Sequence, residues 1–279
     1  MVTETGITEL RARLADLKPQ GARIALIPTM GALHDGHLAL VAAASKVADI
    51  VVVSIFVNPL QFGPSEDYAR YPRTLESDAA KLAENGASIL FAPSPGEMYA
   101  DGSRTTVTPP AFAEAFEGAV RPGHFGGVLT VVAKLFNIVR PDVAIFGRKD
   151  LQQLALIRAM VADLNFPIDI LPVDTVRERD GLALSSRNRY LDEQSRRRAT
   201  RIRAALVAAK AAFDAGVTFP SQIEATGRTV LAQDGALDVD YFGLVRESDF
   251  ERPSAASSGD AIVAAIRIGG TRLIDNILL

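Results

Sequence analysis

The segment that most constrains the fold is an almost wholly apolar, β-branched run at residues 50–57, Ile-Val-Val-Val-Ser-Ile-Phe-Val. A strand with one face in water alternates apolar and polar residues. An unbroken apolar run is instead typical of a central parallel strand that is covered on both faces. Parallel strands need long crossover connections, which are usually helices. The run therefore predicts a sheet with helices packed on both sides.

Predicted strands and helices alternate through the first part of the chain. Shorter apolar runs predict further strands at 23–28, 88–92, 105–107, 143–146 and 168–176. Apolar residues at helical spacing predict helices at 7–17, 37–48, 74–85, 125–139 and 151–164. This alternation indicates an α/β fold with a doubly wound, Rossmann-like parallel sheet and right-handed crossovers. Ligands of such sheets bind beyond the carboxyl ends of the strands.

The pattern changes after residue 175. Helices are expected at 192–215 and 221–232, and strands near 239–245 and 261–268. This mixture predicts a smaller C-terminal α+β domain at 176–279, which follows a Rossmann-like domain at 1–175.

Composition limits the class of protein. The chain has 279 residues, of which 48% are apolar and 23% charged, with a net charge of −3. This balance is typical of a folded soluble protein and provides no basic field for nucleic acid or membrane partners. Cysteine is absent, which excludes disulfides and fits a reducing cytosol. No apolar run is long enough for a membrane span, and the N-terminus lacks a signal-peptide core, so we expect a cytoplasmic location.

Residues 28–37 read Pro-Thr-Met-Gly-Ala-Leu-His-Asp-Gly-His, between a predicted strand and a predicted helix. The first N–H groups of a helix have no intrahelical partner and favour an anion, and Gly31 and Gly36 allow a ligand to approach the backbone. His34 and His37 are three residues apart and would face the same way on a helix. A surface turn with solvated histidines fits this segment, taken alone, equally well.

Two further segments carry amides and charges next to predicted strand ends. In Asn58-Pro59-Leu60-Gln61-Phe62, the amides can bind a hydroxyl or a carboxylate; alternatively, Asn58 caps a turn and Gln61 is solvated. In the segment from Gly147 to Gln153, Lys149 can neutralise a phosphate, and Asp150 can hold a ribose hydroxyl or help to bind a metal. The alternative is a solvated first turn of a helix.

The last two segments are a glycine-rich loop and a hydroxyl-rich loop. Arg121-Pro-Gly-His-Phe-Gly-Gly-Val128 is either a contact for phosphate or carboxylate or only a tight connection. Leu184-Ser-Ser-Arg-Asn188 lies where the two predicted domains join, and its hydroxyls and arginine can bind phosphate oxygens.

Five motifs in this order resemble those of the pantothenate synthetase (pantoate–β-alanine ligase) family, in the HIGH-type nucleotidyltransferase superfamily. They are Pro-Thr-Met-Gly-x-Leu-His-x-Gly-His from 28, Asn-Pro-x-Gln-Phe from 58, Arg-Pro-Gly-His-Phe-x-Gly-Val from 121, Gly-x-Lys-Asp-x-Gln-Gln from 147 and Ser-Ser-Arg-Asn from 185. The resemblance extends to Thr271-Arg-Leu-Ile-Asp-Asn276 near the C-terminus. Each motif alone is weak, but five in order are specific.

The resemblance implies a role for each matched residue. His37, as proton donor, with His34 and Lys149 would be catalytic. Gln61 would contact pantoate and β-alanine, and Gln153 would contact pantoate. Arg148 stands where a more acidic or polar residue is expected. The implied ATP-binding residues are Met30, Gly31, Ala32, Leu33, His34, Asp35, Gly36, His37, Gly147, Arg148, Lys149, Asp150, Val176, Leu184, Ser185, Ser186 and Arg187.

The family resemblance also implies a reaction. Pantoate would attack the α-phosphorus of ATP to give pantoyl adenylate and pyrophosphate, and β-alanine would then displace AMP to give pantothenate. The resemblance further implies a homodimer, magnesium carried by ATP with its protein ligands unknown, and a C-terminal domain that closes over the nucleotide.

Three alternatives share parts of this pattern. A nucleotidyltransferase that transfers AMP to a phosphate is disfavoured by the glutamine pair and by the lack of extra basic residues for a second phosphate. An aminoacyl-tRNA synthetase is disfavoured because the chain is short and acidic and shows no anticodon-binding module. A regulatory protein that binds ATP without turnover would release no pyrophosphate.

Overall fold

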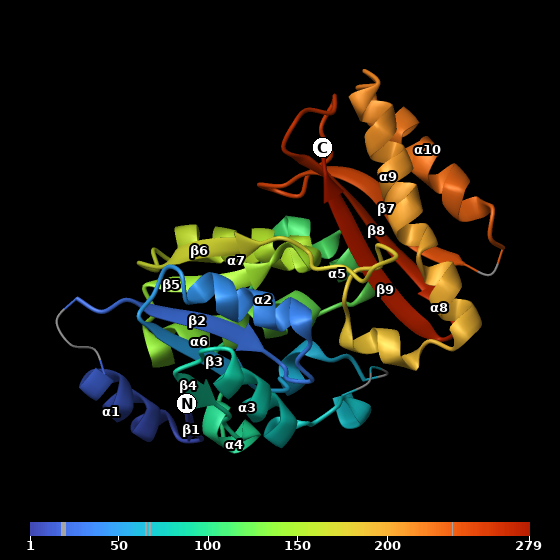
Figure 1. Cartoon of the computed structure of the whole chain (residues 1–279). Helices are drawn as coiled ribbons and strands as arrows, with labels where there is room; N and C mark the ends of the chain where they lie inside the picture. The colour runs from blue at the N-terminus through green and yellow to red at the C-terminus, as the bar shows by residue number, and fades with distance from the viewer. Residues whose placement is uncertain (18–20, 65, 67, 236) are drawn as a thin grey trace. The chain divides into compact units, whose positions relative to one another are not determined.

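The computed structural model describes residues 1–17, 21–64, 66, 68–235 and 237–279 (Figure 1). The described part of the chain divides into two units, one formed by 1–148 with 156–174 and the other by 149–155 with 175–279. The C-terminal unit therefore includes a short segment that lies between two strands of the N-terminal unit in the sequence. The division into functional domains at 175/176 stays a prediction.

The N-terminal unit is built on a parallel sheet. Over the described residues this sheet has six strands in the order β1-β4-β3-β2-β5-β6, and every neighbouring pair is parallel. The chain runs from β2 outward to β3 and β4 and then returns to β5 on the other side of β2. The sheet thus changes direction between β2 and β5, where such folds bind ligands. The strands are β1 (Val2–Glu4), β2 (Ile24–Thr29), β3 (Ile50–Ile55), β4 (Ile89–Phe91), β5 (Val143–Gly147) and β6 (Asp169–Val173).

Helices cover both faces of the parallel sheet. Alternate residues of β2 and β3, among them Ile27 and Val53, pack in one core cluster with Leu40 and Val41 of α2. The intervening residues, such as Leu26, are also buried, so neither face is open to water. The helices are α1 (Ile7–Leu17), α2 (Asp35–Ala44), α3 (Leu75–Glu84), α4 (Pro95–Met98), α5 (Glu117–Val120), α6 (His124–Val139) and α7 (Leu151–Asp163), of which α7 belongs to this unit only from residue 156. Within the described ranges, no helix is both long and apolar enough to cross a membrane.

The C-terminal unit is a separate α+β structure with its own core. In its described residues, three antiparallel strands lie in the order β7-β8-β9. Helix residues such as Ile202 and Ile223 pack with Phe242 and Ile262 of the sheet. Its elements are α8 (Glu193–Ala199), α9 (Arg201–Asp214), α10 (Pro220–Ala232), β7 (Asp238–Arg246), β8 (Asp260–Ile268) and β9 (Thr271–Leu278). Both predicted architectures, the doubly wound parallel sheet and the smaller α+β part, are confirmed.

Two of the predicted elements do not form as expected. Residues 105–107 form no strand, because the Val107 N–H donates to Thr130 Oγ1 at 2.9 Å and two prolines without N–H groups follow. The single helix predicted at 192–215 is two helices that meet at Thr200, whose hydroxyl donates to the Arg197 carbonyl at 2.7 Å. Such local side-chain bonds compete with the helical ladder.

The contact between α10 and β7 gives a test of the C-terminal core. A Cβ added at Gly227 would lie 2.1 Å from the Cζ atom of the buried Phe242 ring. We expect Gly227→Ala to force the helix from the sheet and to lower the free energy of unfolding by about 1–3 kcal/mol, measured by urea denaturation. Gly235→Ala is the control, because its added methyl meets no atom within 4 Å. Equal unfolding midpoints for the two variants would contradict this packing.

Candidate active site

The predicted site residues after β2 form a turn that is held by a buried carboxylate. Gly31 and Ala32 both have positive φ, +83° and +52°, which is strained for alanine. Asp78 of α3 is fully buried and accepts the N–H of Ala32 at 2.8 Å and that of Leu33 at 2.9 Å. It also accepts the hydroxyl of Thr74 at 3.0 Å. One carboxylate from a distant helix therefore fixes the backbone of the motif.

His34 and His37 cap α2 reciprocally. His34 is the N-cap, with extended backbone at φ −134° and ψ 175°. Its Nδ1 accepts the Gly36 N–H at 3.2 Å, and its own N–H donates to His37 Nδ1 at 3.3 Å. The two ring centroids lie 4.2 Å apart. The predicted helix start at His37 is thus two residues late, but the two imidazoles do lie together.

The cap fixes the tautomer of both imidazoles. Since each Nδ1 accepts a main-chain N–H, the proton of each neutral ring belongs on Nε2, an assignment that follows from the hydrogen-bond pattern. Protonation at Nδ1 would break the cap bond. Two Nε2–H donors are therefore presented at the start of α2, next to the helix N–H groups that favour an anion.

Gln61 contacts the same turn. Its Nε2 donates to the sulfur of Met30 at 3.0 Å, and its side chain is mostly buried. Asn58 donates Nδ2 to Gln61 Oε1 at 3.2 Å and caps the 3₁₀ helix Pro59–Gln61 by accepting the Leu60 N–H. Asn58 thus caps a turn, as one of the two interpretations of this segment expected. The same interpretation expected a solvated Gln61, and that part is wrong because Gln61 is buried.

Tyr99 supports this arrangement from the end of α4. Its hydroxyl donates to Asn58 Oδ1 at 2.8 Å. Burial raises the pKa of Tyr99 to about 12, so this donor stays protonated at ordinary pH. The Gln61 side chain is consequently held by a chain of hydrogen bonds within the protein, from Tyr99 through Asn58.

The glycine-rich segment from residue 121 holds the main chain of the Gln61 loop. A Cβ at Gly127 would lie 2.2 Å from the Leu60 carbonyl oxygen, so only glycine allows this close approach. His124 Nδ1 lies 2.8 Å from the Gln61 carbonyl, and Arg121 forms an ion pair with Glu66 at 2.6 Å. The sequence left two interpretations of this segment, a contact for phosphate or carboxylate and a tight connection. In the structure, Arg121 and His124 form contacts within the tight connection.

His124 is a neutral donor in this connection. Burial, and after it the positive charge of Arg121, lowers the pKa of His124 to about 4. The neutral ring then donates Nδ1–H to the Gln61 carbonyl, and its Nε2 accepts from Arg121 at 2.9 Å. Burial raises the pKa of Glu66, but the hydrogen bonds and charge of Arg121 outweigh it and hold that pKa below its ordinary value.

In the C-terminal unit, a short hairpin brings two predicted residues together. The Leu184 N–H donates to the Val176 carbonyl at 3.0 Å, and Arg177 pairs with Ala183 in an antiparallel bridge. Ser185 then caps the 3₁₀ helix Ser186–Tyr190 by accepting the Arg187 N–H at 3.2 Å. The loop with the predicted phosphate-binding hydroxyls therefore has a defined backbone.

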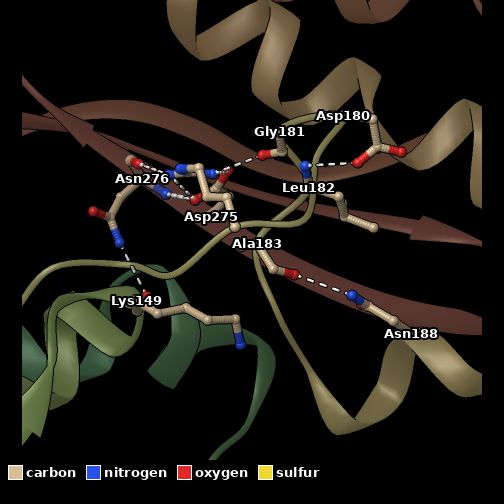
Figure 2. A network of polar contacts seen from close by, with 9 residues as sticks. Lys149, Asp180, Gly181, Leu182, Ala183, Asn188, Asp275 and Asn276 are labelled. Carbon is tan, nitrogen blue, oxygen red and sulfur yellow. Dashed lines mark hydrogen bonds and ion pairs between the residues drawn. The ribbon is translucent and has the colours of Figure 1, made fainter. Parts of the chain in front are cut away.

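Contacts from Asn188 and from Asp275 of β9 hold this hairpin in place (Figure 2). The Asn188 side chain donates to the Ala183 carbonyl at 3.1 Å. It also donates to the Glu178 carboxylate at 2.8 Å. Arg177 pairs with buried Asp275 through two hydrogen bonds of 2.7 and 2.9 Å. The Asn276 side chain donates to the Lys149 carbonyl at 2.9 Å.

The remaining predicted residues are divided between the units. Gly147 ends β5, and Arg148 pairs with Asp174 at 3.2 Å in the N-terminal unit. Lys149, Asp150 and Gln153 belong to the C-terminal unit, where Asp150 is exposed and Gln153 is partly buried. The predicted site residues thus form two groups, one in each unit.

Several supporting residues were missed from the sequence. Asp78 holds Ala32 and Leu33, which are predicted ATP-binding residues. Tyr99 and Asp275 act one contact further away, through Asn58 and Arg177. The sequence did contain a signal for Asp78. It lies four residues before Leu82, and this spacing places a carboxylate on the buried side of the helix. In the described ranges, no three His, Cys, Asp or Glu side chains are grouped to hold a metal ion.

Comparison with known proteins gives a consistent result. The family described as Pantoate-beta-alanine ligase matches residues 2–278. The chain is 53% identical to pantothenate synthetase of Acidothermus cellulolyticus over 97% of this chain and 89% of that protein. It resembles the crystal structure of pantothenate synthetase from Thermus thermophilus with a TM-score of 0.94, 46% identity and 99% of each chain covered. It also resembles a pantoate-beta-alanine ligase from Francisella tularensis, complexed with "Beta-gamma ATP and Beta-alanine", with a TM-score of 0.82, 33% identity and coverage of 100% and 97%. The resemblance inferred from the motifs is confirmed.

Removing the carboxylate of Asp78 tests the turn after β2. Asp78→Ala leaves the N–H groups of Ala32 and Leu33 without their acceptor, so we expect a loss of about 2–4 kcal/mol in unfolding free energy. Amide hydrogen exchange at residues 32 and 33 should accelerate more than exchange in β6. Glu84→Ala is the control, since this carboxylate lies exposed at the end of the same helix. Unchanged exchange at both amides would show that Asp78 does not hold the turn.

The lowered pKa of His124 predicts a specific acid sensitivity. Because the folded-state pKa is about 4 against an ordinary 6.5, the unfolded chain alone binds this proton between those values. The stability contribution is therefore complete above pH 6.5 and is lost as pH falls toward 4. It amounts to about 3 kcal/mol at most. Urea unfolding between pH 7 and pH 4 should show a smaller loss for His124→Gln than for the natural chain. Equal losses would refute the neutral, buried histidine.

Proposed function

Because the chain belongs to the pantoate–β-alanine ligase family, we propose that it makes pantothenate from pantoate, β-alanine and ATP through a pantoyl adenylate. The family itself gives the enzyme class, a ligase that forms pantothenate. ATP is the proposed nucleotide, which is supported by the Francisella tularensis relative described with an ATP compound and β-alanine. AMP and pyrophosphate are the proposed by-products.

The observation that carries the proposal is the reciprocal cap at the start of α2. It presents two Nε2–H donors beside the helix N-terminus at the carboxyl end of β2, next to the point where the sheet changes direction. This edge is where doubly wound sheets bind ligands, and the donors suit phosphate oxygens. We assign ATP to the turn from Met30 to His37 and to the predicted residues at 147–150, 176 and 184–187.

In the first step, a carboxylate oxygen of pantoate forms a bond to the α-phosphorus, and the bond from that phosphorus to pyrophosphate breaks. Both reactants are anions, so the enzyme must align them and compensate the charge that moves onto pyrophosphate. We assign this role to the ammonium of Lys149 and to His34 and His37, whose Nε2–H groups donate hydrogen bonds. His37 is the proposed proton donor; to transfer a proton its ring must first be protonated at Nδ1, which breaks its cap bond with the His34 N–H. Arg187 and the helix N–H groups bind further phosphate oxygens.

In the second step, the amine of β-alanine bonds to the activated carbonyl carbon and AMP leaves, while the amine loses a proton. We assign pantoate to Gln61 and Gln153 and β-alanine to Gln61. Neutral amides suit a small acid with hydroxyl groups, because they bind without adding charge. The buried contacts of Gln61 with Met30 and Asn58 hold its amide in one orientation, and such preorganisation favours a defined substrate position.

Three finer features belong to the same proposal. Magnesium accompanies ATP, since this ion is commonly bound by phosphates with one or two carboxylates and not by a cage of side chains. The enzyme is a homodimer, as the resemblance implies. It acts in the cytoplasm, which fits a chain without cysteine.

Pantoate-dependent exchange of pyrophosphate into ATP tests the adenylate, and subsequent addition of β-alanine should yield pantothenate and AMP. We expect His37→Ala to slow exchange about 10²–10³-fold, because one donor to the developing charge is lost. His37→Gln restores an acceptor for the His34 N–H, as in an ordinary capping box, and should remain at least about tenfold slow.

Lys46→Ala, at an exposed position after the same helix, is the control and should exchange normally. Full pyrophosphate exchange in His37→Gln would show that His37 serves only as a helix cap. Binding of ATP without pantoate-dependent exchange in the natural chain would favour a regulatory protein, and a dinucleotide product would favour AMP transfer to a phosphate.

A further inference from the structure

Lys149 is held through its main chain by a residue from the far end of the sequence. The Asn276 side chain donates Nδ2 to the Lys149 carbonyl oxygen at 2.9 Å, and Asn276 is only 6% exposed (Figure 2). The Lys149 side chain extends away from this bond (Figure 2). The amide thus holds the backbone that carries the ammonium and does not engage the ammonium itself.

Asn276 has a rigid position of its own. It lies in β9, where it pairs with Val263 of β8. Its carbonyl accepts from Arg177 at 3.2 Å, and its N–H donates to Asp275 Oδ1 at 2.8 Å. Arg177 is in turn fixed by its two bonds to the buried Asp275. An ion pair and a sheet therefore define where the Asn276 amide points.

The position of the Lys149 backbone depends on a hydrogen bond of this kind. It lies in a single 3₁₀ turn, Arg148–Asp150, between β5 and α7. Such turns have poor hydrogen-bond geometry, and a lysine side chain is long and has many rotamers. The protein limits the reach of the ammonium mainly by fixing the backbone from which the side chain departs. A displacement of about 1 Å in a catalytic group is sufficient to slow a reaction by orders of magnitude.

We propose that Asn276 is a positioning residue for Lys149, whose backbone it fixes so that the ammonium meets the phosphates during adenylate formation. This inference rests on the role proposed above for Lys149. It assigns a function to the Asp275-Asn276 pair near the C-terminus: Asp275 orients Arg177, Arg177 holds the Asn276 carbonyl, and the Asn276 amide holds residue 149.

The test compares the two half-reactions in Asn276→Asp. This change keeps the size of the side chain but replaces the donor with an oxygen that repels the Lys149 carbonyl. Single-turnover formation of pantoyl adenylate should slow about tenfold or more. Release of pantothenate from supplied pantoyl adenylate and β-alanine should stay within about twofold, because that step forms no pyrophosphate. Equal slowing of both half-reactions would indicate general structural damage and overturn the proposal.

A double-mutant cycle identifies the path of the effect. If Asn276 acts through Lys149, Asn276→Asp should change the adenylation rate by less than about twofold in a Lys149→Ala background. A full additional loss there would overturn the proposal. Asn137→Asp is the matched control, since Asn137 also donates its amide to a main-chain carbonyl, that of Ala133 at 2.9 Å, and it should leave both half-reactions unchanged.

A second variant keeps the test decisive if the buried carboxylate prevents folding. Asn276→Ala removes the donor without adding charge, and it should reproduce the selective loss of adenylation while its far-ultraviolet circular dichroism stays native. Normal adenylation in a folded Asn276→Ala would overturn the positioning role. If Lys149→Ala itself adenylates normally, the role of Lys149 fails and the inference with it, whereas pantothenate formation by the natural chain still tests the proposed function separately.

Discussion

The site loops depend on one constraint, that a buried main-chain N–H or C=O group needs a hydrogen-bond partner. Where the chain leaves the parallel sheet, the ladder no longer provides partners, and buried polar side chains replace it. Asp78 accepts two N–H groups of the turn after β2. His124 lies against the Gln61 carbonyl, and Asn276 donates to the Lys149 carbonyl. Each of these three predicted segments is therefore held by a residue from a different part of the chain.

Several of the supporting side chains are neutral or paired with an opposite charge. Arg121 pairs with Glu66, and Arg177 pairs with Asp275. His124 is neutral because burial and Arg121 lower its pKa to about 4. The caps of His34 and His37 fit neutral rings that act as hydrogen-bond donors. In the proposed mechanism, Lys149 brings a positive charge to the polyphosphate, and the two imidazoles bring hydrogen-bond donors.

Some residues of the family motifs have a structural role and no proposed part in the reaction. Gly127 belongs to the motif from residue 121 because α6 begins against the Leu60 carbonyl, where a Cβ has no room. Asn58 opens the motif that contains Gln61 because its amide both caps the turn and orients the glutamine. Asn188 closes the Ser-Ser-Arg-Asn motif because it bonds the hairpin before it. These positions serve geometry, and the reactive residues beside them depend on that geometry.

The sequence by itself determined the parallel α/β fold, the α+β part and the motifs of the family, because apolar period and short motifs are local properties of the chain. It also predicted that His34 and His37 lie together, since residues three apart share a helix face. The break at Thr200 and the strands β1 and β9 escaped it, because hydrogen-bond partners decide where a helix breaks and which edge segments become strands. Only the tertiary structure decided that Asp78 holds the turn 46 residues before it and that Asn276 holds the Lys149 carbonyl 127 residues before it. Such contacts join residues that have no local relation in sequence, so only the packed chain brings them within hydrogen-bonding distance.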